Sequence, residues 1–457
     1  MNSSLLSQNQ ARSRESSVTG NGRAPRTVLI VGADFAPSSY PPALRIRFFA
    51  RHLPQFGWKP IILTTEPRYY EWSVDPENEK LLPSDLEVIR TRALPASVTR
   101  KIGIGDLGIR SLWHHWRALS QLCRQRKVDL IFIPVPPNPT MVLGRLAHAR
   151  FGIPYVIDYI DPVVTDCYWK LPGSQRPPKH AMAYALARLM EPFALKHVSQ
   201  LVGVDTSYTA GAFARYKWLA GVEAAGIPYG GEPADFQYLR EHPRPNRFFD
   251  KNDGRLHVCY VGRGGVDILP ALRAVFEAVK LGLQRRPELF NRLRLHFVGT
   301  TYAPDAAGQY QMLPAAKDAG IESLVDEHPE RVPYLDAMQI LLDSHALLVL
   351  GSESAHYTAS KIFPYILADR PLLAIFHEES SVVRILEETQ SGNVVTFGSS
   401  CSIGEKTEEI AKLLQQTLSL PRGYTPPTRW EAFEAYTTRA MTLRLAQVFD
   451  KAFAGAS

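Results

Sequence analysis

The sequence predicts an α/β protein with two Rossmann-like, doubly wound domains that face one another across a central cleft. At 457 residues the chain is too long for one compact core. Short apolar, β-branched runs alternate twice with helical patterns of period near 3.6, which is typical of βαβ units and parallel sheets. Periodicity is lost at 227–254, where Pro, Gly and charged residues accumulate. Ligands of such sheets bind beyond the carboxyl ends of the strands, so we expect the site in the cleft.

The first residues, 1–26, are polar and rich in Ser, Asn and Arg, and they contain no apolar segment of signal-peptide length. We therefore expect a disordered tail here. No later run reaches the roughly 18 apolar residues of a membrane span. Four cysteines lie far apart without a C-x-x-C pair, so neither a zinc site nor a disulfide framework is indicated. These features favour a cytoplasmic protein.

The first domain is expected over 27–228. Its predicted strands are 28–34, 59–65, 86–92, 130–135, 155–160 and 201–206. Predicted helices include 43–56, 112–125 and 181–197.

A linker is expected over 229–254, followed by the second domain over 255–420. The predicted strands of this domain are 256–262, 293–299, 346–351, 371–376 and 393–398, and one of its helices is 268–284. The Pro-rich stretch PRGYTPPT precedes a long helical pattern at 429–453. We expect the last segment, 421–457, to return to the first domain as a helix.

The formal net charge of +7 favours anionic partners such as nucleotides or lipid phosphates. No nucleic-acid-binding module accompanies this charge, so DNA and RNA are not expected as partners. The segment 112–127 allows two interpretations. Its cations and its two tryptophans, Trp113 and Trp116, would suit docking on anionic lipid at the inner face of a membrane. Alternatively, its leucines pack on the sheet and its charges are solvated. The cations are Arg117, Arg124, Arg126 and Lys127, and the leucines are Leu112, Leu119 and Leu122.

Several segments together resemble retaining glycosyltransferases of family 4, which have the GT-B fold. They are ALRIRFFARHLPQFGWKPIILTT, PYVIDYIDP, LVGVDTSYT, IPYGGEPADF and SKIFPYILADRPLLAI, in this order. The resemblance spans about residues 27–400. It implies transfer of a sugar from a nucleoside-diphosphate sugar to a polysaccharide, glycolipid or other glycan, as in cell-envelope assembly. It also implies that neither a metal nor another cofactor takes part.

The resemblance places the donor site in the second domain. Family members carry a ribose-binding Glu where this chain has Pro364, which offers neither an acceptor nor an N–H. Glu353 is then the nearest acidic candidate to hold the ribose. The loop 352–360 could also bring His356 to the donor's phosphates, or His356 is only a surface loop residue. The loop after the first strand of this domain, with Gly262, Arg263 and Gly264, matches the family's diphosphate-binding loop. A lysine usual in the family is missing, and Lys361 would supply its charge.

The acceptor side is expected in the first domain, where Arg45 would bind an anionic group. Asp158 and Asp161 come at the end of a predicted strand, where side chains reach the cleft. Asp161 is the candidate catalytic carboxylate. The alternative is that Asp161 caps a turn, because Asp-Pro commonly opens one.

Two functions remain open on the sequence alone. One is a working transferase in which Arg263 and backbone N–H groups stabilise the departing diphosphate. The other is a degenerate GT-B protein that no longer transfers sugar and serves as a glycan-binding or partner subunit. Loss of the ribose carboxylate favours the second function, and retention of Asp161, Arg263 and Lys361 favours the first.

Overall fold

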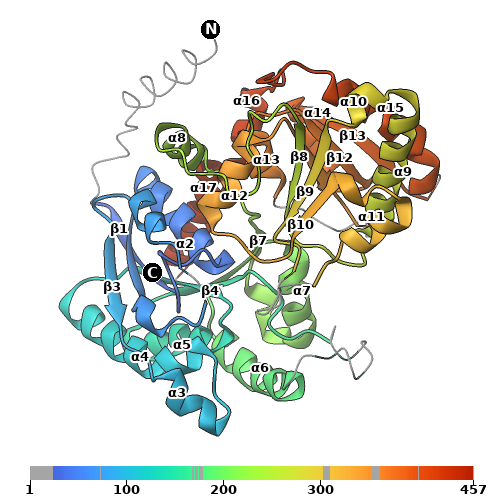
Figure 1. The fold of residues 1–457 in the computed structure, drawn as a ribbon. Coiled ribbons are helices and arrows are strands. Elements are labelled where there is room, and N and C mark those ends of the chain that lie inside the picture. The colour runs from blue at the N-terminus through green and yellow to red at the C-terminus, as the bar shows by residue number, and fades with distance from the viewer. Residues whose placement is uncertain are drawn as a thin grey trace. The chain divides into compact units, whose positions relative to one another are not determined.

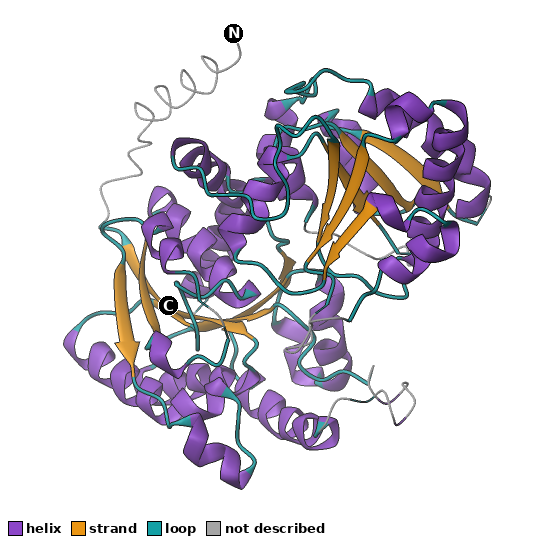
Figure 2. Cartoon of the chain, viewed as in Figure 1, coloured by secondary structure: helices purple, strands orange, loops and turns teal. Residues whose placement is uncertain are grey.

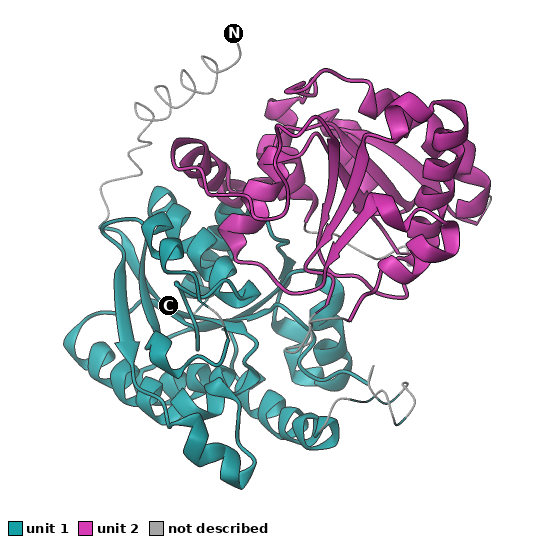
Figure 3. Ribbon diagram, in the orientation of Figure 1, with its two compact units in different colours: residues 1–229, 441–457 teal, residues 230–440 magenta. Residues whose placement is uncertain are grey.

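The computed structural model describes residues 24–455, except 73, 167–168, 170–172, 174–175, 177–178, 302–308, 353–360 and 400. The chain divides into two compact units (Figure 3). Unit 1 comprises residues 1–229 and 441–457, and unit 2 comprises residues 230–440. Each unit contains one parallel sheet with helices around it (Figure 2), so the predicted α/β class is confirmed.

Within the described residues, unit 1 is built on a seven-stranded sheet in the order β3-β2-β1-β4-β5-β6-β7, and every neighbouring pair is parallel. The strands are β1 (Arg26–Val31), β2 (Trp58–Thr65), β3 (Glu87–Thr91), β4 (Leu130–Val135), β5 (Tyr155–Tyr159), β6 (Gln200–Gly203) and β7 (Ala224–Gly226). The main helices are α2 (Pro41–His52), α3 (Ala96–Thr99), α4 (Leu107–Gln125), α5 (Val142–Phe151), α6 (His180–Leu195), α7 (Thr206–Arg215) and α17 (Thr438–Ala454) (Figure 1).

Helices cover both faces of this sheet, because the central strands are apolar on both sides. All of β4, LIFIPV, is buried. On one face Ile131 and Ile133 share a core with residues of α4, α5 and α6. On the other face the ring of Phe132 contacts Phe49 of α2 and Phe449 of α17.

From Met441 onward, the last helix, α17, belongs to unit 1. Its Phe449 is fully buried and packs edge-on against Trp58 of β2, with ring centroids 5.4 Å apart. Asp450, the next residue, accepts hydrogen bonds from Trp58 Nε1 at 3.2 Å and from Arg26 Nη1 at 2.6 Å. The C-terminal helix therefore completes the cover of the first sheet.

Unit 2 contains a six-stranded sheet within the described residues, in the order β10-β9-β8-β11-β12-β13, again with parallel pairs throughout. The strands are β8 (Leu256–Val261), β9 (Leu293–Val298), β10 (Val325–His328), β11 (Ala346–Leu350), β12 (Leu372–His377) and β13 (Asn393–Phe397). The helices are α8 (Pro233–Glu241), α9 (Leu269–Arg285), α10 (Pro287–Phe290), α11 (Leu313–Ala319), α12 (Tyr334–Asp343), α13 (Ile362–Leu367), α14 (Ser381–Thr389), α15 (Thr407–Leu418) and α16 (Trp430–Phe433).

Three features of this architecture were not apparent in the sequence pattern. The range 229–254, expected to be a linker, contains the helix α8. Strands β7 and β10 were not predicted. Their sequences, AAG and VDEH, are too short and too polar or small to give an apolar strand signal.

The described part of the chain was also searched for membrane-crossing helices. No helix there is long and apolar enough to span a bilayer.

The docking of α17 gives a testable prediction. Phe449→Ala should lower the free energy of unfolding by about 3–5 kcal/mol, because it leaves a cavity against Trp58 and Phe132. Urea unfolding followed by tryptophan fluorescence measures this change. Leu443→Ala on the same helix is the matched control: Leu443 is 41% exposed, so its loss should have little effect. Equal effects of the two substitutions would show that α17 is not packed as described.

Candidate functional site

The polar residues of unit 2 that can bind a ligand gather where the strand order reverses. Strand β8 is followed in the chain by its neighbour on one side, β9, whereas β11 lies on its other side. Loops from β8 and β11 therefore leave the sheet in opposite directions at this switch point, which is where open α/β sheets bind ligands. Gly262 and Arg263 directly follow β8, and Lys361 is the residue before α13 in the β11–β12 connection.

Lys361 lies directly against the backbone of Gly262. A Cβ atom at Gly262 would overlap the end of the Lys361 side chain, so a larger residue there would displace the lysine from this position. The ammonium Nζ lies 6.0 Å from the centre of the Tyr260 ring. Among the described residues, no carboxylate forms an ion pair with Lys361. The structure thus brings together two residues that are 99 positions apart in the sequence.

The charge of Lys361 is held in an unfavourable environment. The pKa of its ammonium group is lowered from 10.5 to about 8, mainly by desolvation and in addition by the positive charges of Arg263 and Arg331. The group is still mostly protonated at pH 7. A partly buried cation near two further cations can bind an anion, because an anion would relieve both the desolvation and the repulsion.

The loop after β8 holds Arg263 in place. The phenol of Tyr260 donates a hydrogen bond to the Arg263 carbonyl at 2.7 Å. Arg263 Nη2 forms an ion pair with Asp267 at 2.8 Å, and this pair is about one-third exposed. A ligand phosphate would have to compete with Asp267 for the guanidinium.

The backbone donors of this loop are partly committed. The N–H of Gly262 donates to the Val298 carbonyl at 2.8 Å, and the N–H of Gly264 donates to the Thr300 carbonyl at 2.7 Å. These N–H groups bind the neighbouring β9 connection rather than standing open to a phosphate. The side-chain charges of the loop, rather than these two amides, are therefore available to an anion.

Pro364 is the third residue of α13, which begins at Ile362. The N–H groups of the first helical turn have no intrahelical partner, so proline loses no hydrogen bond at this position. Its side chain is three residues after Lys361 and therefore on the same side of the helix. Glu353, the candidate replacement for the missing carboxylate, and His356, the candidate phosphate contact, lie outside the described residues.

In unit 1 the two residues expected on the acceptor side bind each other. Arg45 on α2 and Asp158 on β5 form a bidentate ion pair, with Nε–Oδ2 at 2.6 Å and Nη2–Oδ1 at 3.0 Å. Both side chains are almost fully buried. The pair links α2 to the sheet, and breaking a buried pair of this kind typically costs about 3–5 kcal/mol. Most of the Arg45 guanidinium is thus used inside the protein, and its role toward an acceptor stays a prediction.

Two buried polar atoms beside this pair have no hydrogen-bond partner in the described part of the chain. They are Arg45 Nη1 and the phenol oxygen of Tyr229. The guanidinium carbon of Arg45 lies 5.3 Å from the centre of the Tyr229 ring. Burial raises the pKa of Tyr229 well above its usual value, so its hydroxyl is a neutral donor. Buried polar groups are normally paired, so a water molecule or a polar ligand group can bind these two atoms.

Three carboxylates face this position and act on the pKa of Tyr229: Asp158, Asp161 and Asp34. Asp161 is exposed, and desolvation by nearby protein atoms raises its pKa above the usual range. Asp34 follows β1 and is buried. Burial raises its pKa to about 6, although Ser38 Oγ donates a hydrogen bond to it at 2.7 Å.

Sequence reasoning did not single out Asp34 or Tyr229. Asp34 stands directly after a strand in VLIVGAD, which is the same signal that identified Asp161. Tyr229 comes from IPYGG in a loop, and no local pattern distinguishes it from a surface tyrosine. Only the fold places it beside Arg45.

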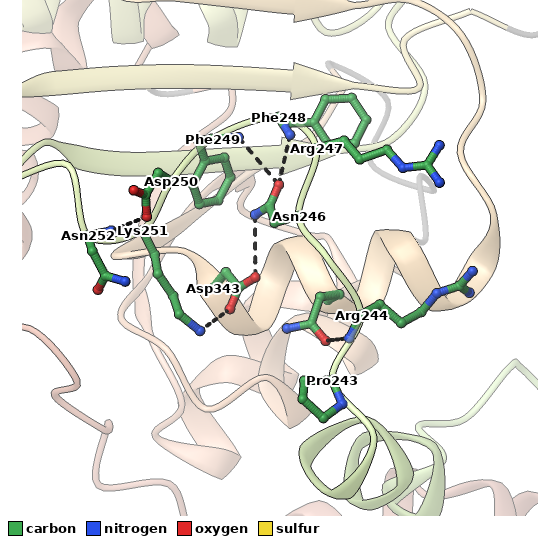
Figure 4. A pocket seen from close by; sticks show the side chains of 11 residues that line it. Pro243, Arg244, Asn246, Arg247, Phe248, Phe249, Asp250, Lys251, Asn252 and Asp343 are labelled. Carbon is green, nitrogen blue, oxygen red and sulfur yellow. Dashed lines mark hydrogen bonds and ion pairs between the residues drawn. The ribbon is translucent and has the colours of Figure 1, made fainter.

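A pocket of about 510 Å³ lies elsewhere in unit 2, along the segment 243–252 and the end of α12 (Figure 4). Its polar groups bind one another: Lys251 Nζ pairs with Asp343 at 2.9 Å, and the Arg244 N–H donates to Gln339 at 3.0 Å. None of the predicted site residues lines it. The pocket is therefore a surface hollow beside the segment 243–252, which leads into β8, and it is not the candidate site.

The described residues contain no group of three or more His, Cys, Asp or Glu side chains that could hold a metal ion. The expectation of metal-free chemistry stays a prediction.

Residues 42–230 match the family described as a glycosyl transferase 4-like domain. The resemblance to family 4 glycosyltransferases is thereby confirmed over this range, which forms most of unit 1. A search among curated protein sequences found no match.

Solved structures resemble the whole chain. One is a UDP-forming α,α-trehalose-phosphate synthase from Burkholderia xenovorans in complex with glucose-6-phosphate, with 12% identity, a TM-score of 0.56, and 93% of this chain and 100% of that chain covered. Another is HepE from Anabaena in complex with UDP-glucose, with 13% identity, a TM-score of 0.53, and 93% and 99% covered. A third is a glycosyltransferase from Rickettsia africae, with 11% identity, a TM-score of 0.51, and 94% and 99% covered. At these identities the likeness shows the fold, and the predicted GT-B fold is confirmed.

The environment of Lys361 predicts that this residue destabilises the free protein. Its pKa in the folded state, about 8, is below the unfolded value of 10.5, so the unfolded chain binds more protons between these values. The free energy of unfolding should therefore rise as the pH rises from about 8 to 10.5. At pH 7 the protonated Lys361 should destabilise the fold to its full extent. Lys361→Met should raise the free energy of unfolding at pH 7 by about 1–3 kcal/mol. It should also abolish the increase of stability with pH between about 8 and 10.5.

Urea unfolding at pH 7 and pH 10 tests this expectation. The control is Lys280→Met, because Lys280 on α9 is half exposed beside Glu277 and should change stability little. A methionine variant at position 361 that is less stable than the native protein at pH 7 would contradict the analysis.

Proposed function

We propose that this protein is a retaining glycosyltransferase that uses a nucleoside-diphosphate sugar, with its diphosphate site at Lys361, Arg263 and Arg331 of unit 2. The observation that carries the proposal is the partly buried side chain of Lys361, whose ammonium has two arginines nearby and no carboxylate partner among the described residues. Such a cluster is unfavourable in the free protein and becomes favourable only with an anion bound. Its place at the β8/β11 switch point is where a nucleotide would bind in this fold.

The chemistry of the transfer gives these cations a role. When the sugar leaves its donor, negative charge develops on the diphosphate. Preorganised cations stabilise this charge more strongly in the transition state than in the bound donor, so they lower the activation barrier. The solved structure of HepE with UDP-glucose supports a UDP-sugar as the donor. The retaining outcome rests on the resemblance to family 4.

Unit 1 would then supply the acceptor-side groups. Arg45 Nη1 and the Tyr229 hydroxyl are buried donors without a partner among the described residues, and both can bind an acceptor oxygen. Asp161 is the exposed carboxylate that can accept a hydrogen bond from an acceptor hydroxyl. A polysaccharide, glycolipid or other glycan provides such hydroxyls.

The second candidate is a degenerate GT-B protein that binds a glycan or a partner without transferring sugar. Pro364 in the place of the ribose-binding carboxylate favours it. The uncompensated charge of Lys361 favours the working enzyme. This charge destabilises the free protein, and only a bound anion would offset its cost.

Titration with UDP tests the diphosphate site. Arg263→Ala should weaken UDP binding by more than about tenfold, because a charge-assisted hydrogen bond to phosphate contributes roughly 1.5–3 kcal/mol. Lys361→Met should weaken binding similarly. Isothermal titration calorimetry measures both effects. The control is Arg285→Ala, since Arg285 pairs with Glu408 on the surface and should not affect UDP. Unchanged affinity in both site variants would place the diphosphate elsewhere, and absence of binding by any nucleotide in a panel would favour the degenerate protein.

A substitution at position 364 tests whether the native donor site is functional or degenerate. Pro364→Glu should fold, because glutamate is favourable in a first helical turn. In a working site built around proline, the new carboxylate lies one turn from Lys361, competes with the diphosphate for it, and lowers UDP affinity severalfold. Pro364→Gln, which lacks the charge, should have a smaller effect. A gain in UDP affinity with glutamate would instead show that the native site is a relic that has lost its ribose contact.

A further inference from the structure

We propose that Tyr365 is a positioning residue of the diphosphate site and holds Lys361, at the start of α13, against the loop after β8. A double hydrogen bond carries this inference: it joins the phenol of Tyr365 to the backbone of Val261, the last residue of β8. The inference rests on the proposed function for the identity of the anion, but the placement of Lys361 can be tested without any ligand.

Strand β8 is paired unequally on its two sides. With β9 it pairs along its whole length, up to Val261 opposite Val298. With β11, among the described residues, it pairs only at Val258 and Cys259. The N–H of Gly262 donates to the Val298 carbonyl on the β9 side. Because successive backbone groups of a strand alternate between its two neighbours, those of Val261 point to the β11 side, where the pairing has already ended.

The phenol of Tyr365 takes the place of a strand residue at this position. Its oxygen accepts a hydrogen bond from the Val261 N–H at 2.6 Å, and its O–H donates to the Val261 carbonyl at 3.2 Å. Only 2% of Tyr365 is exposed. Without the hydroxyl, two backbone groups beside a buried ring would lose their partner, which costs free energy. The contact therefore joins α13 to β8, beside which it lies in Figure 1, at the point where β8 and β11 separate.

One helical turn connects this contact to Lys361. The N–H of Tyr365 donates to the Lys361 carbonyl at 3.4 Å, and residues four apart lie on the same side of a helix. The end of the Lys361 side chain lies against the backbone of Gly262, the residue that follows Val261. The two side chains thus contact two successive residues at one strand end. The contact of Tyr365 therefore determines where Lys361 lies relative to the loop that carries Arg263.

Helix α13 is too short to fix its own position. It has six residues, Ile362–Leu367, and no side-chain hydrogen bond caps its start. Isolated helices of this length are not stable in water, so tertiary contacts must hold it. Its apolar residues are buried, but apolar packing is non-directional. The phenol of Tyr365 supplies the directional contact that apolar packing lacks.

The position of Lys361 matters because its charge is held there at a cost. Its ammonium is desolvated and lies near Arg263 and Arg331. A flexible lysine side chain would turn toward water if the helix turn that carries it could move. The ammonium would then no longer lie beside the loop after β8. Tyr365 thus keeps the cation where a diphosphate can bind it, at the expense of the stability of the free protein.

Urea unfolding at pH 7 tests the placement of Lys361 without a ligand. The four proteins to compare are the native chain, Tyr365→Phe, Lys361→Met and the double variant. Lys361→Met should raise the urea midpoint in the native background. In the Tyr365→Phe background it should raise the midpoint by about half as much or less, because the released ammonium already reaches water. Equal gains in both backgrounds would overturn the proposal.

Calorimetric titration of the same four proteins with UDP tests the consequence for binding. Tyr365→Phe should weaken UDP binding by about fivefold or more when Lys361 is present, and by less than about twofold in the Lys361→Met background. A tyrosine that only supports the fold would change the affinity equally in both backgrounds, and this result would also overturn the proposal. If the native protein binds no UDP but the unfolding data show the coupling, the positioning role is confirmed and the proposed function is wrong.

The matched control is Tyr155→Phe in unit 1. Tyr155 is fully buried, and its hydroxyl lies 2.7 Å from the Ala194 carbonyl and 2.9 Å from the Lys196 carbonyl. Its loss should also lower the urea midpoint, because it removes a buried hydroxyl that contacts two backbone carbonyls. It should leave both the UDP affinity and the gain from Lys361→Met unchanged.

Hydrogen exchange at the Val261 amide gives a second measurement if Tyr365→Phe does not fold. Lys361→Met removes the charge that opposes the contact between α13 and β8. The Val261 N–H should then exchange at least about threefold more slowly than in the native protein, relative to the Leu295 amide of β9. An unchanged ratio of the two exchange rates would overturn the proposal.

Discussion

Parallel pairing of the strands is the constraint on which the rest of this structure depends. It places the carboxyl ends of all described strands of a sheet at one edge, and it requires helices on both faces of that sheet. Residues that follow different strands are thereby brought together. Gly262 after β8 meets Lys361 in the connection after β11, and Asp34 after β1 and Asp158 on β5 both act on the pKa of Tyr229.

The two units use buried charge in opposite ways. In unit 1, Arg45 and Asp158 neutralise each other through two hydrogen bonds, and the pair supports the packing of α2 on the sheet. In unit 2, Lys361 is partly buried without such a carboxylate among the described residues, and two arginines add to the cost of its positive charge. A compensated charge serves the fold, whereas an uncompensated one indicates a ligand that the fold alone does not supply.

The candidate site could be predicted in part. Arg263 and Lys361 were found because the resemblance to family 4 fixes their places relative to the strands. Their mutual repulsion, and the absence of a carboxylate partner for Lys361 in the described part of the chain, were not predictable, because they depend on the packing of Lys361 over Gly262. The same holds for Arg45 and Asp158, which are 113 residues apart and were assigned separately to the acceptor. Tyr229 and Asp34 were missed because burial, rather than local sequence, distinguishes them.

The sequence by itself determined the fold class and most strands, because apolar runs buried on both faces and the spacing between them are local properties of the chain. It also determined the glycosyltransferase resemblance, through segments that are each contiguous. Only the tertiary structure decided which polar groups are paired and which are not. Pairing depends on distances between residues far apart in the chain, and the free energy of a buried charge depends on all the atoms around it.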